Sequence, residues 1–370
     1  MRITIRLCVI FINLWIFPVL AKPAQPQAFD QAVFEQLDFG LYWFGDDMAY
    51  QKSEFNRDSP YFDPEAPTMI FVHGWEVGES KRQYREVFDY GFIGGPREYL
   101  AQAWLDDGWN VGVFYWNQFS DELMPHVSEA KVWSHKASGG MRWKDHEGKT
   151  HKEAPSKSAS QLFFESYVAA MMSYRGDTVR IVGHSFGNQM AIVLGKKILD
   201  KVETGQLPPH LLPRRMALLD PAYMGGQRAF LGGKTTSEVA LQYAQQLAAA
   251  GVVFEAYRTS QLMLFTPITD RAQPLMDLTA YTQLKFLFFP IVDFQKQHIA
   301  SIWHYFWSYQ FEPPTVDGVV GAGLSASASD ERVLELMGGG KLTQIKGRWG
   351  KSPDNDEFTR VAQESGGQVD

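Results

Sequence analysis

Five short apolar segments constrain the fold of this chain more than any other feature. They alternate with stretches whose apolar residues recur at helical spacing, and they cover residues 68–72, 110–115, 178–182, 215–219 and 252–257. Runs this short and this apolar are typical of strands buried on both faces. Strands that alternate with helices form a mainly parallel sheet with helices on both faces. The sequence therefore predicts one principal α/β domain whose functional side chains lie beyond the carboxyl ends of its strands.

The third apolar segment ends in a motif that predicts a nucleophile. Residues 183–187 read Gly-His-Ser-Phe-Gly, which fits the pattern G-x-S-x-G, and residues 188–202 have the apolar spacing of a helix. A serine on a sharp strand-to-helix turn requires glycines two positions before and after it, because side chains there would collide. We therefore predict that Ser185 is a nucleophile. The alternative is an ordinary serine in a glycine-rich turn.

The first apolar segment is followed by a turn that predicts part of an oxyanion hole. This turn is His73-Gly74-Trp75. Backbone amides are free at such a turn and at the start of the helix behind the serine, where the helix dipole is also positive. We assign the oxyanion hole to the backbone amides of Trp75 and Phe186. His73 is interpreted as a structural residue that holds the turn by hydrogen bonds.

Three motifs resemble those of the pancreatic and lipoprotein lipase family, which includes phospholipase A1 relatives. They are the His73 turn, the serine motif and Leu219-Asp220-Pro221-Ala222, and the likeness extends over about residues 65–310. The resemblance implies the α/β-hydrolase fold and a triad of Ser, Asp and His in chain order, which needs no metal or organic cofactor. Asp220 then matches the acidic member. The alternative is that Asp220 only starts a turn before proline. Asp270 or Asp293 would then be the acidic member of the triad.

Two histidines match the third triad position differently. In the family the histidine is followed by tyrosine seven residues later and by serine ten residues later, which this chain satisfies for His298 and not for His304. The arginine that usually lies two residues after the histidine is Ala300 here. A histidine at the start of an aromatic helix can also reach over the sheet to Ser185. We predict His298 and keep His304 as the alternative.

These assignments together predict a hydrolase. His298 takes the proton from Ser185 during attack on an acyl carbonyl and returns it to the leaving alcohol, while Asp220 fixes the imidazole tautomer. Water then hydrolyses the acyl-enzyme. We expect an enzyme that cleaves lipid esters: a triacylglycerol lipase, a phospholipase A1 or a short-chain esterase. A peptidase with the same triad and a non-catalytic exported binding protein on the same fold are the alternatives from other classes.

Several features depart from the lipase family. Vertebrate members carry several disulfides, whereas this chain has a single cysteine, Cys8, among its first 21 residues. Asn188 replaces the small residue usual after the serine motif, and few residues follow Ser308, so the family's separate lipid-binding sandwich is not expected. These departures indicate a distant microbial branch. The apolar run at 284–294 is predicted to line an acyl pocket, to form a lid or to be ordinary core.

The amino terminus is typical of a secretory signal peptide. Arg2 and Arg6 precede an apolar run from residue 7 to residue 19 that is short for a membrane span, and Ala21 is a small residue where cleavage is expected. We expect residues 1–21 to be removed and the protein to be secreted or periplasmic. An uncleaved membrane anchor is the alternative.

The net charge and the aromatic content indicate which classes of partner and substrate this chain can bind. The formal charge is −7, and loss of Arg2 and Arg6 with the leader would make it two units more negative. An acidic balance argues against nucleic acid as a partner. The 14% of aromatic residues suits an apolar substrate or an aromatic core. We expect a lipid or other ester as substrate, with transient contact with a lipid interface.

Two polar segments flank or interrupt the predicted domain, which spans residues 22–347. Residues 120–156 are predicted to form an ordered excursion over the active site or a mobile loop. The histidines of this region do not have the spacing of a standard metal site, so a solvated loop is the interpretation; the residues concerned are His126, His135, His146 and His151, with Glu129 and Asp145. Residues 348–370 are polar and charged, and we predict no regular structure for them.

Overall fold

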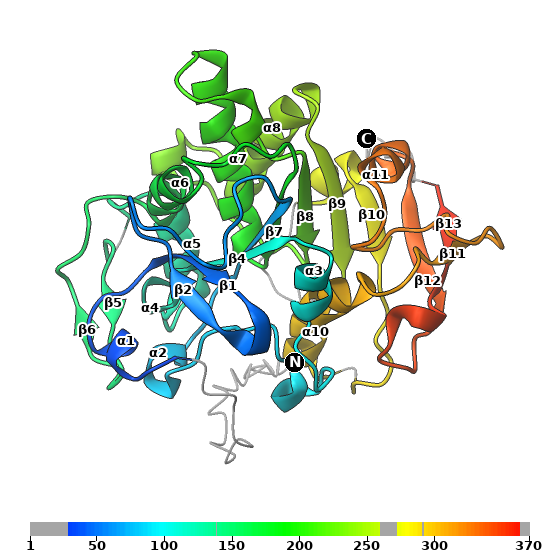
Figure 1. The fold of residues 1–370 in the computed structure, drawn as a ribbon, viewed down its shortest axis with the longest axis horizontal. Helices are drawn as coiled ribbons and strands as arrows, with labels where there is room; N and C mark the ends of the chain where they lie inside the picture. The colour runs from blue at the N-terminus through cyan, green and yellow to red at the C-terminus, as the bar shows by residue number, and fades with distance from the viewer. Residues whose placement is uncertain (1–28, 138, 260–271, 291, 363–370) are drawn as a thin grey trace, which may run out of the picture.

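The central feature is an eleven-stranded sheet in the order β11-β13-β12-β10-β9-β8-β7-β3-β4-β1-β2 (Figure 1). The computed structural model describes residues 29–137, 139–259, 272–290 and 292–362 of the 370-residue chain. All neighbours from β12 to β4 in this order run parallel. Strands β1, β2 and β13 are attached antiparallel toward the two edges. The predicted leader, residues 1–21, lies outside the described residues.

The five predicted strands are all present and form the middle of the sheet. Two of them, β7 and β9, are displaced along the chain by one or two residues from the prediction. The prediction of a mainly parallel sheet is confirmed. These strands are β3 (Thr68–Val72), β4 (Asn110–Tyr115), β7 (Val179–His184), β8 (Arg215–Leu219) and β9 (Val253–Arg258), and the others are β1 (Gly40–Phe44), β2 (Tyr50–Lys52), β10 (Ala280–Gln283), β11 (Thr315–Val316), β12 (Lys341–Lys346) and β13 (Glu357–Val361).

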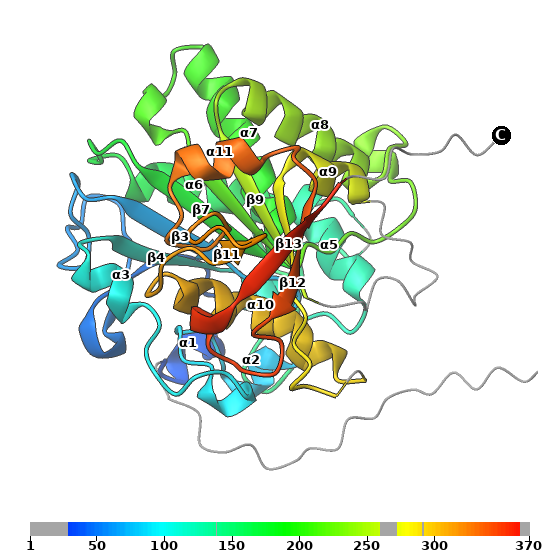
Figure 2. The ribbon, with the colours of Figure 1, turned by 90° about the vertical axis from the view of Figure 1, so that its right-hand side faces the viewer.

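Helices cover both faces of the sheet, because successive strand residues point to opposite sides. In β3, Ile70 and Val72 belong to one hydrophobic cluster, and Met69 and Phe71 belong to the other. Figure 2 shows the two layers, with α7 and α8 above the strands and α10 below. The first layer is α6 (Ala159–Ala170), α7 (Gly187–Glu203) and α8 (Thr236–Ala249), and the second includes α3 (Gln102–Asp106), α10 (Phe294–Ser308) and α11 (Asp330–Leu336).

The region 120–156 is an ordered excursion in its described residues rather than a mobile loop. It contains α5 (Pro125–Trp133) and a hairpin of β5 (Trp143–Lys144) and β6 (Thr150–His151). The solvated-loop interpretation is wrong for α5, where Glu129 and Lys131 are buried together with Val132. The polar composition was misleading because these charged side chains are paired inside the protein. The remaining short helices are α1 (Ala32–Glu35), α2 (Glu79–Arg82), α4 (Asn117–Ser120) and α9 (Gln273–Leu278).

The carboxy-terminal segment corrects a second prediction. Residues 357–361 form β13, which pairs antiparallel with β12, so the expectation of no regular structure for residues 348–370 is wrong for this part. Phe358 is buried in the second hydrophobic cluster, and this burial stabilises the strand. Just before it, the buried carboxylate of Asp356 accepts hydrogen bonds from Gln344 and His304. These contacts come from distant residues, so local composition did not reveal them.

No helix in the described part of the chain is long and apolar enough to cross a membrane. The leader, on which the signal-peptide and anchor predictions fall, is not among these residues.

Candidate active site

Ser185 lies on a strained turn between β7 and α7. Its φ of 55° is in the left-handed region, where residues other than glycine are uncommon. A Cβ atom at Gly183 would lie 2.7 Å from the backbone nitrogen of Asn188, and one at Gly187 would lie 2.1 Å from the carbonyl oxygen of Val72. Only glycine fits at these two positions, for the steric reason that the motif implies. The serine itself is buried, with 7% of its surface exposed.

Asn188 fastens this turn to the neighbouring strand. Its Nδ2 atom donates to the carbonyl oxygens of Ser185 at 3.0 Å and of Leu219 at 2.9 Å. The backbone amide of Ser185 also donates to Leu219, at 3.0 Å. A small residue at position 188 could not make these bonds. The sequence marked this position only as a departure from the lipase pattern, whereas in the fold it links the nucleophile turn to the end of β8.

Asp220 and His298 are in direct contact. Asp220 follows the last residue of β8 and is buried, and its Oδ2 atom lies 2.7 Å from Nδ1 of His298 in the second turn of α10. Thr259, just after β9, supports the carboxylate from the other side. Its backbone amide donates to Oδ1 of Asp220 at 3.3 Å, and its hydroxyl lies 3.0 Å from Oδ2 and 2.7 Å from the carbonyl oxygen of Gln297. Three chain segments therefore fix the aspartate relative to the histidine.

His184 attaches His298 to the nucleophile turn. Nε2 of His184 donates to the carbonyl oxygen of His298 at 3.1 Å, and the centroids of the two imidazole rings are 4.3 Å apart. Burial lowers the pKa of His184 well below its ordinary value. His184, the residue directly before Ser185, is therefore a neutral hydrogen-bond donor. Sequence analysis assigned it no role, since a histidine inside the serine motif carries no separate signal.

The reserve candidates have other partners or lie elsewhere. His304 is buried one and a half turns further along α10, with Nε2 at 2.8 Å from Oδ2 of Asp356. Asp293 caps the amino terminus of α10 and forms an ion pair with Lys296 at 2.7 Å. Asp270 lies outside the described residues. Of the described acidic candidates, Asp220 is the one that the structure places beside the strand carrying Ser185.

The turn after β3 approaches the nucleophile closely. A Cβ atom at Gly74 would lie 2.5 Å from Cβ of Ser185 and 3.0 Å from its Oγ atom, so the backbone of this turn passes directly beside the serine. Phe186 forms a small buried apolar cluster with Ala222 and Met224, against which Trp75 packs. The two residues assigned to the oxyanion hole thus each lie next to a residue of this close approach, Trp75 after Gly74 and Phe186 after Ser185, and both side chains belong to or pack against one cluster.

His73 is structural, as interpreted from the sequence. It is fully buried, and its Nε2 atom accepts a hydrogen bond from the backbone amide of Trp116 at 3.1 Å. Burial lowers the pKa of His73 to about 3. The ring is therefore neutral with its proton on Nδ1, which lies 3.1 Å from the carbonyl oxygen of Gly74 and 3.1 Å from Oε1 of Glu76. It holds the turn that bears Trp75.

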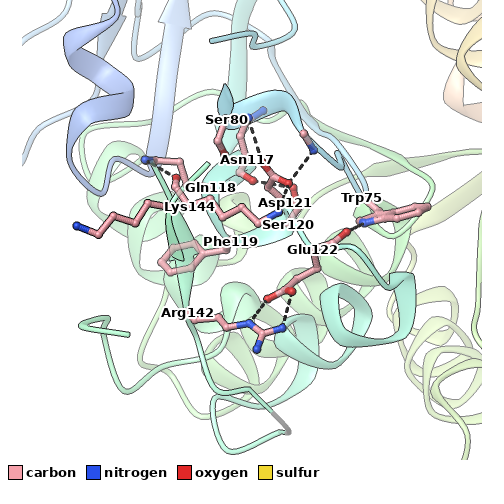
Figure 3. Close-up of polar contacts among 12 residues, drawn as sticks. Trp75, Ser80, Asn117, Gln118, Phe119, Ser120, Asp121, Glu122, Arg142 and Lys144 are labelled. Atoms are coloured by element: carbon pink, nitrogen blue, oxygen red, sulfur yellow. Dashed lines mark hydrogen bonds and ion pairs between the residues drawn. The ribbon is translucent and has the colours of Figure 1, made fainter. Parts of the chain in front are cut away.

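A polar network beside this turn joins it to the excursion (Figure 3). The indole Nε1 of Trp75 donates to the carbonyl oxygen of Glu122 at 2.6 Å. Asp121 accepts from the backbone amides of Gly78 at 2.7 Å and Ser80 at 3.2 Å and pairs with Lys144 at 2.9 Å. These contacts span about 40 residues of chain, so no local sequence pattern predicts them.

Part of the apolar run before α10 belongs to the core, whereas Leu287 and Val292 are exposed. Leu284, Phe286 and Phe289 are buried in the second hydrophobic cluster, and Phe286 stacks on Trp303 with ring centroids 5.5 Å apart. Of the three interpretations of residues 284–294, ordinary core packing holds for these side chains.

The histidines of the excursion do not form a metal centre in the described structure. His151 pairs with Asp145 at 2.7 Å and stacks on Trp143, and Glu129 instead pairs with Arg228 at 2.8 Å. In the described ranges no group of three or more His, Cys, Asp or Glu side chains is arranged to hold a metal ion.

The parallel sheet, its helical layers and the strand-to-helix turn of Ser185 define the α/β-hydrolase fold. No protein-family model and no curated protein matches the sequence. Similar solved structures include the thioesterase domain from the curacin biosynthetic pathway (14% identity, TM-score 0.23, covering 50% of this chain and 47% of that one). They also include the carboxylesterase EstE1 from a metagenomic library (16% identity, TM-score 0.21, covering 49% of this chain and 45% of that one). A third is an esterase from the archaeon Pyrobaculum calidifontis (12% identity, TM-score 0.24, covering 59% of this chain and 61% of that one).

This chain spans less than half the length of the thioesterase and EstE1 chains that it matches. The fold assignment rests on the topology of the sheet and on the nucleophile turn.

Proposed function

We propose that this protein is a serine hydrolase that cleaves carboxylic esters through Ser185, His298 and Asp220. One observation supports the proposal: the Asp220–His298 pair is attached to His184, the residue directly before the buried Ser185 on its strained turn. Such a turn costs free energy, and strained residues persist where the fold over-determines them, often at functional sites. The same three residue types in this chain order fit a nucleophile, a base and a residue that orients the base.

The proposed reaction proceeds through an acyl-enzyme. Nε2 of His298 accepts the proton of the Ser185 hydroxyl while Oγ attacks the ester carbonyl carbon. Asp220, bonded to Nδ1, keeps the proton of the neutral ring on Nδ1 and stabilises the imidazolium that forms. The carbonyl oxygen becomes negative and is bound by the amides of Trp75 and Phe186. The ester C–O bond then breaks, and His298 gives its proton to the leaving alcohol. Water repeats the sequence on the acyl-enzyme, releasing the acid and free serine.

Lipid esters are the proposed substrates. The apolar cluster of Phe186, Ala222, Met224 and Trp75 lies beside the proposed oxyanion amides, where it can contact the hydrocarbon part of an ester. A triacylglycerol lipase is the first form of this proposal, and a phospholipase A1 or a short-chain esterase follows it. We also propose that the leader exports the protein to the periplasm or the medium, where it contacts lipid interfaces transiently.

A substrate panel with a matched variant tests the proposal. The protein without residues 1–21 should hydrolyse p-nitrophenyl acyl esters, triglycerides or phospholipids, and Ser185→Ala should lower kcat by at least about 10⁴-fold while leaving the fold intact. Equal ester hydrolysis by the variant would remove Ser185 from the mechanism. Activity on aminoacyl amides that exceeds activity on esters would favour a peptidase. A wild-type protein that folds but neither cleaves esters nor reacts with a fluorophosphonate would favour a binding protein.

A further inference from the structure

The turn that bears Trp75 is held by a segment that lies about 40 positions away in the chain. Residues 116–122 run beside residues 73–80 and contact them repeatedly. The backbone amide of Trp116 donates to Nε2 of His73, and its indole donates to the carbonyl oxygen of His73 at 2.9 Å. Asn117 donates to the carboxylate of Glu76. The turn after β3 is thus attached at several points to residues 116–122.

The strongest of these attachments involves Asp121. Its side chain is almost completely buried, with 1% of the residue exposed. The carboxylate accepts from Gly78 N and Ser80 N at the start of α2, and Lys144 from β5 supplies a balancing charge (Figure 3). Gly78 has no side chain with which to cap α2, so Asp121 supplies the missing acceptor. Bonds from an ionised carboxylate to backbone amides are stronger than neutral ones.

The next residue makes a second attachment, nearer to the nucleophile. The carbonyl oxygen of Glu122 accepts from the indole of Trp75 at 2.6 Å. The Glu122 carboxylate is itself fixed, because Arg142 donates to both of its oxygens at 2.7 Å and Lys131 donates to one at 2.7 Å. The carbonyl that bonds Trp75 therefore belongs to a residue with little freedom to move. Trp75 in turn packs against the apolar cluster that contains Phe186, the other residue assigned to the oxyanion hole.

We propose that Asp121 and the Glu122 carbonyl are positioning groups that fix the oxyanion hole before the substrate arrives. Asp121 sets the backbone of residues 78–80, and Glu122 sets the indole of Trp75. Donors that are already oriented toward the developing oxyanion need no reorganisation during the reaction, which is the basis of their effect on rate. The excursion is then a fixed wall of the active site rather than a lid. The inference rests on the proposed hydrolase function.

The chain offers a close control for Asp121. Asp145, in the turn between β5 and β6, is also buried, accepts from two backbone amides, of Glu147 at 3.0 Å and Lys149 at 2.9 Å, and pairs with a basic side chain, His151. Within the described chain, Asp145 forms no hydrogen bond or ion pair with residues 73–80. Asp121→Asn and Asp145→Asn therefore remove the same kind of charge from the same kind of site.

The test compares the steady-state kinetics of these variants on a p-nitrophenyl ester. Asp121→Asn should lower kcat by about 10- to 100-fold, because a small displacement of oriented donors has effects of this size, with KM changed less than about threefold. Asp145→Asn should change both constants by less than about threefold. A fall in kcat for Asp121→Asn no larger than that for Asp145→Asn would overturn the proposal.

A second variant decides the question if Asp121→Asn does not fold. Trp75→Phe keeps an aromatic ring for packing but loses the bond to Glu122, and kcat should fall by about tenfold with KM nearly constant. An unchanged kcat would overturn the role of Glu122. Absence of Ser185-dependent hydrolysis in the wild-type protein is a different result: it would contradict the proposed function, and this positioning role with it.

Discussion

Helix α10 carries two histidine–aspartate pairs with almost equal N–O distances, one made by Nδ1 of His298 and the other by Nε2 of His304. His298 lies 2.7 Å from Asp220, and His304 lies 2.8 Å from Asp356. Their surroundings differ. The first pair is partly exposed and lies against the residue before Ser185, whereas the second is buried between the core and the carboxy-terminal segment. A histidine with a carboxylate partner is therefore not evidence of catalysis by itself, and its position relative to a nucleophile is what separates the two roles.

The largest expected effect comes from the first pair. His298→Ala should lower kcat for ester hydrolysis by about 10⁴- to 10⁶-fold, because it removes the base that is proposed to take the proton of Ser185. Rates should be measured on p-nitrophenyl esters with purified, folded protein. His304→Ala is the matched control, and its kcat should stay within about tenfold of the wild type. Similar losses in both variants would contradict the assignment.

Asp220→Asn should have the next largest effect. The amide keeps the shape of the carboxylate but favours the wrong imidazole tautomer and cannot stabilise the imidazolium, so kcat should fall by about 10⁴-fold. Asp356→Asn makes the same change in the second pair and should leave kcat within about threefold. The comparison fails if Asp356→Asn costs as much activity as Asp220→Asn.

For the free energy of unfolding, loss of the second pair should matter more than loss of the first pair. His304→Ala leaves the buried Asp356 carboxylate without one of its donors, and the free energy of unfolding should fall by about 1–3 kcal/mol. His298 is more exposed, so His298→Ala should cost less than His304→Ala. Urea unfolding followed by circular dichroism measures both values. If His298→Ala proved the more destabilising variant, the second pair would not be the structural one.

The last prediction concerns the pH dependence of stability and tests whether His184, which contacts the first pair, is neutral in the folded protein. Burial lowers the pKa of His184 below its unfolded value, so the unfolded state binds a proton that the folded state does not. The contribution of neutral His184 to stability should therefore be complete above about pH 6.5. The free energy of unfolding should fall as the pH decreases below that value. His184→Gln should flatten this fall by up to about 1.4 kcal/mol per pH unit, measured by urea unfolding between about pH 4.5 and pH 7.5. An unchanged slope would mean that His184 is not held neutral.

The sequence predicted those parts of the fold and site that local patterns encode. The five central strands follow from short apolar runs, and the Ser185 turn follows from glycine spacing between a strand and a helix. The choice of His298 over His304 depended on a family register, and both histidines proved to have aspartate partners.

Long-range contacts account for what the sequence did not predict. Asp121 acts on residues 78–80 across about 40 positions, and β13 is stabilised by burial of Phe358 and by pairing with β12. Polar composition led to the two wrong predictions, a solvated loop at residues 120–156 and no regular structure at residues 348–370. A charged segment is interpreted as solvated unless its partners are known. Asn188 shows the same limit, since its two acceptors include Leu219, which is distant in sequence.

Labelling with a fluorophosphonate tests the central claim most directly, because the reagent reports on an activated serine without assuming a substrate. Mass spectrometry of the digested protein should place one adduct on the peptide containing Ser185 in the wild type and in His304→Ala. In His298→Ala the adduct should be nearly absent. Equal labelling of Ser185 in the two histidine variants, or no labelling of this peptide in the folded wild-type protein, would contradict the account.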